Sequence, residues 1–228
     1  MPLLRHMFTT ASFLGLFAII GTALVALTFI NTEERIADNE LQALLHSLHE
    51  LVPPRLHDNP LSENTIIVHD PELLGSKKPI TIYQARKYGK PVAVILAPTA
   101  PDGYNGDIKL LVAIDQYGLL MGVRIVGHRE TPGLGDAIEI ERSNWVEGFN
   151  GYARDNPGSL GWRVEKDGGI FDQFTGATIT PRAVVKAVYK TLQYFEAHKE
   201  ALLAPPESRE RSKIKSQTNT SESKHDED

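Results

Sequence analysis

The sequence of 228 residues contains no cysteine. This absence excludes disulfide bonds, cysteine-bound zinc, iron–sulfur clusters and haem attached through a CxxCH motif. If the protein carries electrons, it therefore needs an organic cofactor. The formal net charge is -5, and no run of lysine and arginine dominates the chain. A nucleic-acid partner is not expected, because the phosphate backbone attracts clustered basic residues.

Charged residues are also absent from residues 8–30, FTTASFLGLFAIIGTALVALTFI. An apolar run of about 23 residues is long enough to cross a hydrocarbon core of roughly 30 Å. A cleaved signal peptide is the alternative, but its apolar stretch is usually shorter and no A-x-A site ends this one. The first segment, residues 1–30, is therefore predicted to hold a membrane anchor. Arg5 and Arg35 flank the span, so the positive-inside rule gives little guidance, and we expect the N-terminus inside and the bulk outside.

Residues 31–78 are predicted to be a helical connector. Asn31 and Glu34 are candidates for its N-terminal cap, and Pro53 with Pro54 is expected to end the helix. Leucine and isoleucine recur in it at spacings of mainly three and four, as on one face of a helix, at Ile36, Leu41, Leu44, Leu45, Leu48 and Leu51.

From residue 80 onward, short runs rich in valine, isoleucine and leucine alternate with turn residues, which predicts an antiparallel meander. Apolar residues on both faces of the run 107–115 predict a sheet that is partly covered on both faces. The covering helix is expected at Thr180–Lys199, with Thr180 as its N-cap and Pro181 as its first residue. The strands are expected within residues 80–88, 91–98, 107–115 and 119–128.

The predicted fold class is α+β. One N-terminal transmembrane helix is followed by a single exterior domain, residues 79–204, in which helices pack on an antiparallel sheet. The remaining segment, residues 205–228, has no aromatic residue and is expected to be disordered.

The stretch DQFTGATITPRAV, residues 172–184, precedes and opens the predicted helix. Free N–H groups and the helix dipole at such a position favour an anion, most often phosphate. Gly176 permits a positive φ and Ala177 keeps the turn uncrowded. An ordinary capped helix after a turn is the alternative. Hydroxyl groups surround the same point, from Thr175, Thr178 and Thr180.

This stretch resembles a known family, because DQFTGAT matches the D-x-x-[ST]-G-A-T acceptor of FMN-binding domains. The resemblance implies that FMN is attached covalently, as a phosphoester to Thr178. It also implies attachment by a separate flavin transferase that uses FAD and a divalent metal. The recognition frame would be Asp172, Thr175, Gly176 and Ala177.

A second stretch, HRETPGLG at residues 128–135, narrows the resemblance. It is similar to the ETPGLG segment of the G subunit of the Rnf (Rsx) electron-transport complex. The C subunit of the sodium-translocating NADH:quinone reductase shares that segment and is the alternative. The short chain favours the G subunit. Gly103 to Gly106 and the pair Trp145 and Phe149 match the same pattern, although the two aromatic residues are more typical of a core.

The resemblance also implies cofactor contacts outside the acceptor. The glycines Gly133 and Gly135 would let the chain run close to a flat ring, and Leu134 would add an apolar contact. Tyr104 would cover one ring face. The pyrimidine edge would be hydrogen-bonded by Glu130 or Thr131. A plain turn at PGLG and a plain exposed tyrosine are the alternatives.

The function that the resemblance implies is that of a redox subunit of a translocase, without turnover alone. It would relay electrons between ferredoxin and NAD in a complex that moves ions, in the bacterial inner membrane with the main domain in the periplasm. Other membrane subunits would be its partners. No nucleophile with an adjacent base is visible, so neither a catalytic residue nor a metal site is expected. Two other readings stay open, an anchored module that binds a phosphate ligand reversibly and a purely structural subunit.

Overall fold

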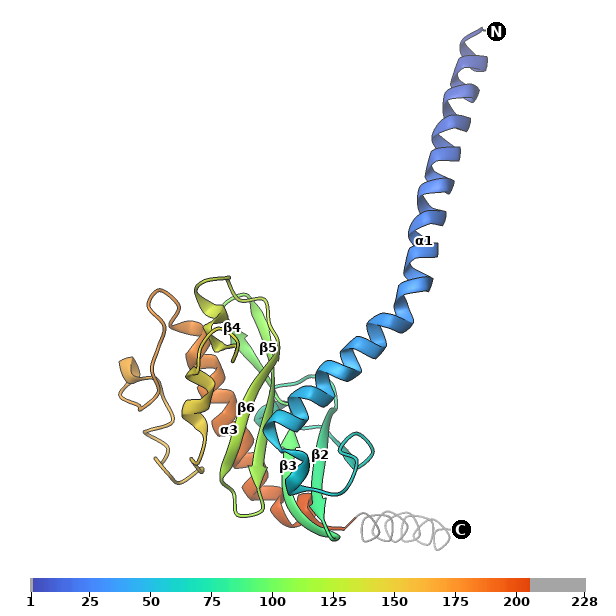
Figure 1. Cartoon of the computed structure of the whole chain (residues 1–228). Coiled ribbons are helices and arrows are strands. Elements are labelled where there is room, and N and C mark those ends of the chain that lie inside the picture. The colour runs from blue at the N-terminus through green and yellow to red at the C-terminus, as the bar shows by residue number, and fades with distance from the viewer. Residues whose placement is uncertain (1, 206–228) are drawn as a thin grey trace, which may run out of the picture. The chain divides into compact units, whose positions relative to one another are not determined.

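The computed structural model describes residues 2–205, without the side chains of residues 2–5, 9, 10 and 34 (Figure 1). The predicted disordered tail lies outside this range except for Pro205. The chain forms two compact units, Met1–Leu44 and Leu45–Asp228. The first contains most of a single long helix, and the second contains the sheet.

Helix α1 runs from Pro2 to Leu51 without interruption. No helix begins at Asn31, where we expected a cap, since α1 continues through this position. The side-chain Nδ2 of Asn31 donates to the carbonyl of Leu27 one turn earlier, at 2.8 Å. Among the described residues, this is the one helix long and apolar enough to cross a membrane, and none of its most apolar window is buried.

Helix α1 ends at Leu51, just before Pro53 and Pro54, which were expected to end it. Only this first part of the expected connector, residues 31–78, belongs to the long helix. The chain then forms a 3-10 turn, η1 (Pro54–Leu56), a strand, β1 (Thr65–Val68), and the one-turn helix α2 (Pro71–Leu74). Strand β1 pairs with the first predicted strand. The folded domain therefore includes elements that precede residue 79.

The sheet is an antiparallel meander, as predicted. Its longest strand pairs with β6 along one edge and with β3 and β4 in succession along the other. Strand β4 was not anticipated, because its sequence TAPDG is typical of a turn. The strands after β1 are β2 (Ile80–Lys87), β3 (Lys90–Leu96), β4 (Thr99–Gly103), β5 (Gly106–Asp115) and β6 (Leu120–Gly127).

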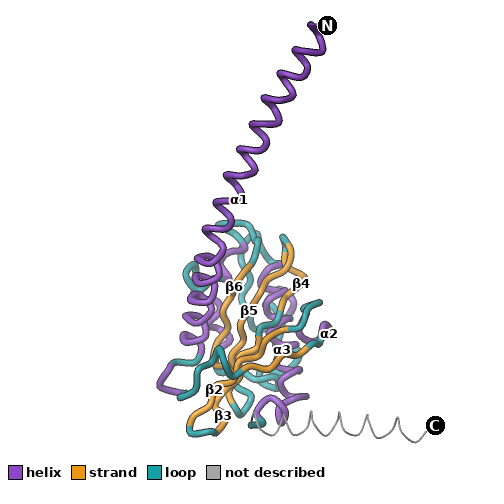
Figure 2. The backbone as a smooth tube through the Cα atoms, turned by 90° about the vertical axis from the view of Figure 1, so that its right-hand side faces the viewer, coloured by secondary structure: helices purple, strands orange, loops and turns teal. Residues whose placement is uncertain are grey.

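Both faces of the sheet are covered, as the pattern of β5 indicated. Helix α3 (Ile179–Leu203) packs on one face (Figure 2). The last turns of α1 cover the other face, where Leu48 and Leu51 are buried. A Cβ atom on Gly122 of β6 would lie 2.8 Å from Leu51 Cδ2, so glycine at this position lets the helix approach the sheet closely.

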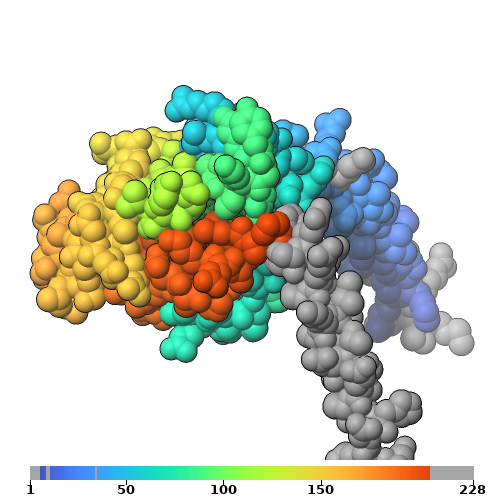
Figure 3. All heavy atoms as spheres, turned by 90° about the horizontal axis from the view of Figure 1, so that it is seen from below, coloured from blue at the N-terminus to red at the C-terminus, as the bar shows by residue number. Residues whose placement is uncertain are grey.

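A long irregular segment joins β6 to α3 and packs beside α3, as the yellow and orange atoms of Figure 3 show. Aromatic rings hold it there. Phe149 is fully buried, and Trp162 stacks on Tyr189 of α3 with 5.7 Å between ring centroids. Three short 3-10 helices interrupt the segment, η2 (Gly135–Ile138), η3 (Trp145–Phe149) and η4 (Glu165–Asp167).

Candidate functional site

The N-cap and the first residue of α3 lie two residues earlier than predicted. The helix begins at Ile179, so Thr180 lies inside the first turn and Pro181 is not its first residue. Thr178 occupies the cap position with helical φ and ψ of -76° and -27°, and its side chain makes no capping hydrogen bond. The hydroxyl group of Thr178 is therefore not used to begin the helix.

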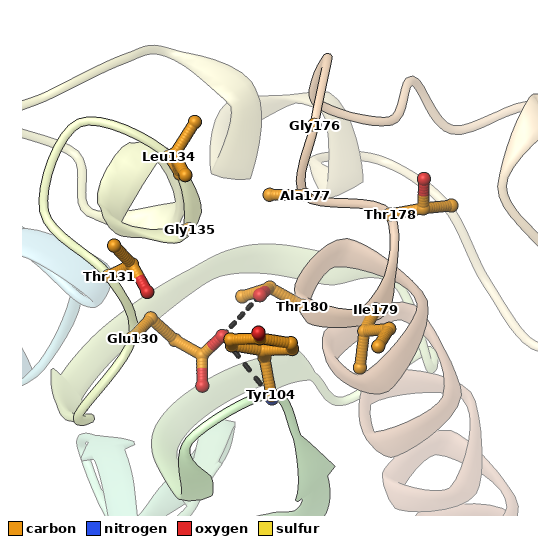
Figure 4. A pocket seen from close by; sticks show the side chains of 10 residues that line it. All are labelled: Tyr104, Glu130, Thr131, Leu134, Gly135, Gly176, Ala177, Thr178, Ile179 and Thr180. Atoms are coloured by element: carbon orange, nitrogen blue, oxygen red, sulfur yellow. Dashed lines mark hydrogen bonds between the residues drawn. The ribbon is translucent and has the colours of Figure 1, made fainter.

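A cavity of about 460 Å³ lies at this helix start (Figure 4). It is formed where the turn after β4, the segment after β6 and the start of α3 meet. Of the eleven residues that the sequence predicted for the site, eight line it. With two further residues of α3, the lining consists of Tyr104, Glu130, Thr131, Leu134, Gly135, Gly176, Ala177, Thr178, Ile179 and Thr180.

Three of the predicted residues do not line the cavity. Asp172 and Thr175 are exposed on the loop before α3. Gly133 lies in the turn that follows Thr131 and has a φ of 77°. It allows that turn to form but is not one of the lining residues. The resemblance did not include Ile179 or Thr180 among the cofactor residues, although the hydroxyl group of Thr180 was expected near the start of the helix.

The three threonines of the acceptor stretch have different environments. Thr175 is exposed outside the cavity. Thr180 is 1% exposed, and its hydroxyl group donates to the carboxylate of Glu130. Thr178 is partly buried and is one of the residues that line the cavity. In Figure 4 its hydroxyl group points up, away from Glu130 and Thr180. Thr178 is thus the threonine that combines access to the cavity with a hydroxyl group free of capping.

Glu130 ties the three parts of the cavity wall together. Its carboxylate accepts hydrogen bonds from the backbone N–H groups of Tyr104, at 3.3 Å, and Asn105, at 3.0 Å, in addition to the hydroxyl group of Thr180. The backbone N–H of Glu130 donates to Nδ1 of His128 at 3.0 Å, and Nε2 of that ring lies 2.7 Å from Oε1 of Glu139. The side chain expected to contact a cofactor is therefore also a structural link.

Two glycines let these parts meet. A Cβ atom on Gly135 would lie 2.9 Å from Cβ of Glu130 and 3.0 Å from Oγ1 of Thr180, so a larger residue would force the wall apart. Gly176 has a φ of 83°, which L side chains rarely adopt. The positive φ at Gly176 agrees with the sequence analysis, whereas the close approach at Gly135 is to Glu130 and Thr180.

The acceptor loop is fixed from its outer side by Trp145. The indole Nε1 of Trp145 donates to the carbonyl of Asp172 at 2.9 Å. Its ring meets Phe174 edge-on, with 5.3 Å between centroids. The carbonyl of Phe174 in turn accepts from the N–H of Ala177 at 3.1 Å. These contacts hold the loop between Asp172 and Ala177 against Trp145.

An ion pair joins η4 to the first turns of α3. Nε of Arg182 lies 2.6 Å from Oδ2 of Asp167, and its NH2 group lies 2.8 Å from Oδ1. This bidentate hydrogen bonding lowers the pKa of Asp167 and raises the pKa of Arg182. In the part of the chain that the structure describes, no three potential ligands from histidine or carboxylate gather around a point that could hold a metal ion.

Comparison with known proteins places these features in context. Residues 103–193 match the FMN-binding domain family, and residues 1–51 match the RnfG N-terminal region. The G subunit of the ion-translocating oxidoreductase complex of Pseudomonas aeruginosa is 52% identical over 90% of this chain and 95% of its own length. The corresponding G subunit of Shewanella loihica is 50% identical over 89% and 95%, respectively. The crystal structure of Shewanella oneidensis NqrC superposes with a TM-score of 0.44 at 23% identity, covering 65% of this chain and 72% of that one.

Proposed function

Since the chain belongs to the family of G subunits of ion-translocating oxidoreductase complexes, we propose that it is a membrane-anchored flavoprotein that carries electrons within such a complex. The identity of 52% to a G subunit, over 90% of this chain, favours this assignment over a C subunit of the sodium-translocating NADH:quinone reductase. The observation that carries the proposal is the convergence of eight predicted cofactor residues on one cavity at the start of α3.

The cavity fits FMN in size and chemistry. Cofactor sites typically measure about 300 to 1,000 Å³ and combine apolar walls with a few polar groups. Tyr104, Leu134 and Ile179 offer apolar surface for a flat ring, and all three are exposed. The N-terminus of α3 favours the phosphate group electrostatically. Bound FMN would supply the electron-accepting ring, and the chain would supply position and polarity.

We assign the attachment point to Thr178, with the linkage a phosphoester. The other two threonines are less suitable, because Thr175 lies outside the cavity and the hydroxyl group of Thr180 is buried against Glu130. In the proposed step, Oγ1 of Thr178 attacks the flavin-side phosphorus of FAD and the diphosphate bond breaks. AMP leaves and the hydroxyl proton is released, so no oxidant or reductant is needed. A separate flavin transferase would catalyse this step.

The wider role is part of the same proposal. Electrons would pass between ferredoxin and NAD through several subunits while ions cross the membrane, and this subunit alone would show no turnover. Residues 8–30 would form the single membrane span, and the domain would lie on the periplasmic side. Asp172 and Thr175, which face solvent, would be available to the flavin transferase.

The test is the intact mass of the denatured full-length protein, expressed in a host with an active flavin transferase and exported. We expect the parent to gain the mass of one FMN less one water and Thr178→Ala to gain nothing. The matched control is Thr175→Ser, which retains a hydroxyl group at position 175, three residues before Thr178. This variant should still carry the FMN.

Two outcomes would contradict the proposal. Flavin that stays bound to denatured Thr178→Ala would move the attachment to another residue. An unmodified parent, in the presence of active transferase, would leave the reversible phosphate-binding module and the purely structural subunit, because neither retains a ligand after unfolding.

A further inference from the structure

The cavity has an uneven charge distribution. Among the ten described residues that line it, Glu130 is the only acidic or basic residue. Its three partners inside the wall, the N–H groups of Tyr104 and Asn105 and the hydroxyl group of Thr180, are all donors. A set made only of donors matches a deprotonated carboxyl group, which accepts and does not donate.

The carboxylate of Glu130 is held in position by its neighbours. Glu130 is 4% exposed, and its backbone is fixed by His128, whose ring is fixed in turn by Glu139. The carboxylate itself is held by the N–H groups of Tyr104 and Asn105 and by the hydroxyl group of Thr180. Within residues 2–205, no lysine, arginine or histidine forms an ion pair with Glu130. The carboxylate is therefore a fixed charge without a neutralising cation.

From this arrangement we infer that Glu130 lowers the reduction potential of the flavin and so limits which donors can reduce it. The inference rests on the proposed FMN site. Reduction adds negative charge inside the cavity, and a carboxylate in the same wall opposes that charge more strongly than it would in water, because the effective dielectric constant is lower. Glu130 affects the flavin through the charge of its carboxylate and through the hydrogen bonds by which it positions the cavity wall. It does not take part in a bond-making step.

The first variant is Glu130→Gln, which removes the charge and keeps the length of the side chain. At a fixed ambient potential, we expect the ratio of reduced to oxidised flavin to rise about tenfold, equivalent to about 30 mV in a two-electron midpoint. Glu130→Asp, which keeps the charge, should stay closer to the parent. The measurement is a spectroelectrochemical titration of the full-length, flavin-loaded protein in detergent.

A second pair of variants leaves Glu130 in place. Thr180→Val removes one hydrogen bond to the carboxylate with little change of volume, so the negative charge is less well compensated. We expect its midpoint to fall below that of the parent. Thr180→Ser retains the hydroxyl group and should match the parent. A purely structural role for Glu130 does not predict shifts of opposite sign in Glu130→Gln and Thr180→Val.

The outcomes separate this inference from the proposed function. A parent without covalent flavin contradicts the proposed function itself. A parent that carries flavin, together with equal midpoints for parent, Glu130→Gln and Thr180→Val, overturns the inference alone. If Glu130→Gln does not fold or load flavin, the comparison of Thr180→Val with Thr180→Ser decides, and equal midpoints in that pair overturn the inference.

Discussion

At the scale of single residues, the cavity wall depends on glycine at position 135, where a side chain would not fit. A Cβ atom at position 135 would press on Cβ of Glu130 and Oγ1 of Thr180, both within 3.0 Å. We expect Gly135→Ala to lower the free energy of unfolding by about 1 to 3 kcal/mol, as overpacking does. The variant should also load less flavin, because the wall must move.

Gly148→Ala is the matched control for this change. A Cβ atom on Gly148 meets no heavy atom within 4 Å, and its φ is not positive. Denaturant unfolding with absorbance of the flavin measures both effects. Equal stability and equal loading in the two variants would show that the close approach at Gly135 has no energetic consequence.

The sequence predicted most of the site but not its internal connections. The resemblance identified eight of the residues that line the cavity, because each position of the family motifs can be matched to a residue of this sequence. It could not show that Thr180 meets Glu130, since the two residues are 50 positions apart and only the fold brings them together. Preference for threonine as an N-cap then favoured Thr180 over Thr178, whereas the backbone at Thr178 occupies the cap position.

At the scale of elements, the acceptor loop depends on the indole of Trp145. Trp145→Phe keeps ring packing against Phe174 and loses the hydrogen bond to the carbonyl of Asp172. A hydrogen bond of this kind contributes about 1 kcal/mol. We therefore expect covalent flavin attachment to slow several-fold in a time course with purified transferase, with the fold retained.

Trp162→Phe is the comparison, because Nε1 of Trp162 donates to Ala153, away from the acceptor loop. It should lower thermal stability, since Trp162 is 4% exposed, and leave the rate of attachment unchanged. Equal rates for Trp145→Phe and the parent would argue against any role of Trp145 in ordering the loop.

The ion pair between η4 and α3 gives a pH dependence with a defined sign. Hydrogen bonding to Arg182 lowers the pKa of Asp167 in the folded state. The stabilisation is therefore complete above the unfolded value of about 4 and is lost as the pH falls through the lower folded value. Asp167→Asn should reduce Tm at pH 7, and the difference from the parent should shrink on acidification.

Thermal melts of both proteins between neutral and strongly acidic pH measure this difference. Asp155→Asn is the control, because the side chain of Asp155 is 82% exposed and pairs with its sequence neighbour Arg154. A difference for Asp167→Asn that grows as the pH falls would reverse the sign of the coupling.

Local patterns also decide which elements could be predicted. The long strands β2, β3, β5 and β6 carry enough valine, isoleucine and leucine to be visible in the sequence. Strand β1 has four residues, and β4 contains proline, aspartate and glycine, so both depend on partners rather than on propensity. For the same reason β1, which pairs with β2, lies before the domain start that the sequence predicted at residue 79.

At the scale of the whole molecule, the boundary of the folding unit can be tested by truncation. The second compact unit begins at Leu45, and its N-terminal turns bury Leu48 and Leu51 on one face of the sheet. A chain of residues 45–228 keeps that cover and lacks the apolar span, so it should be soluble and unfold cooperatively.

A chain of residues 79–228, which follows the boundary predicted from the sequence, loses β1 and exposes Leu111. An uncovered apolar sheet face and a new bare edge strand favour association. We expect aggregation of the shorter chain in size-exclusion chromatography. Similar melting and elution of both chains would mean that residues 45–78 are dispensable for the fold and that the domain does begin near residue 79.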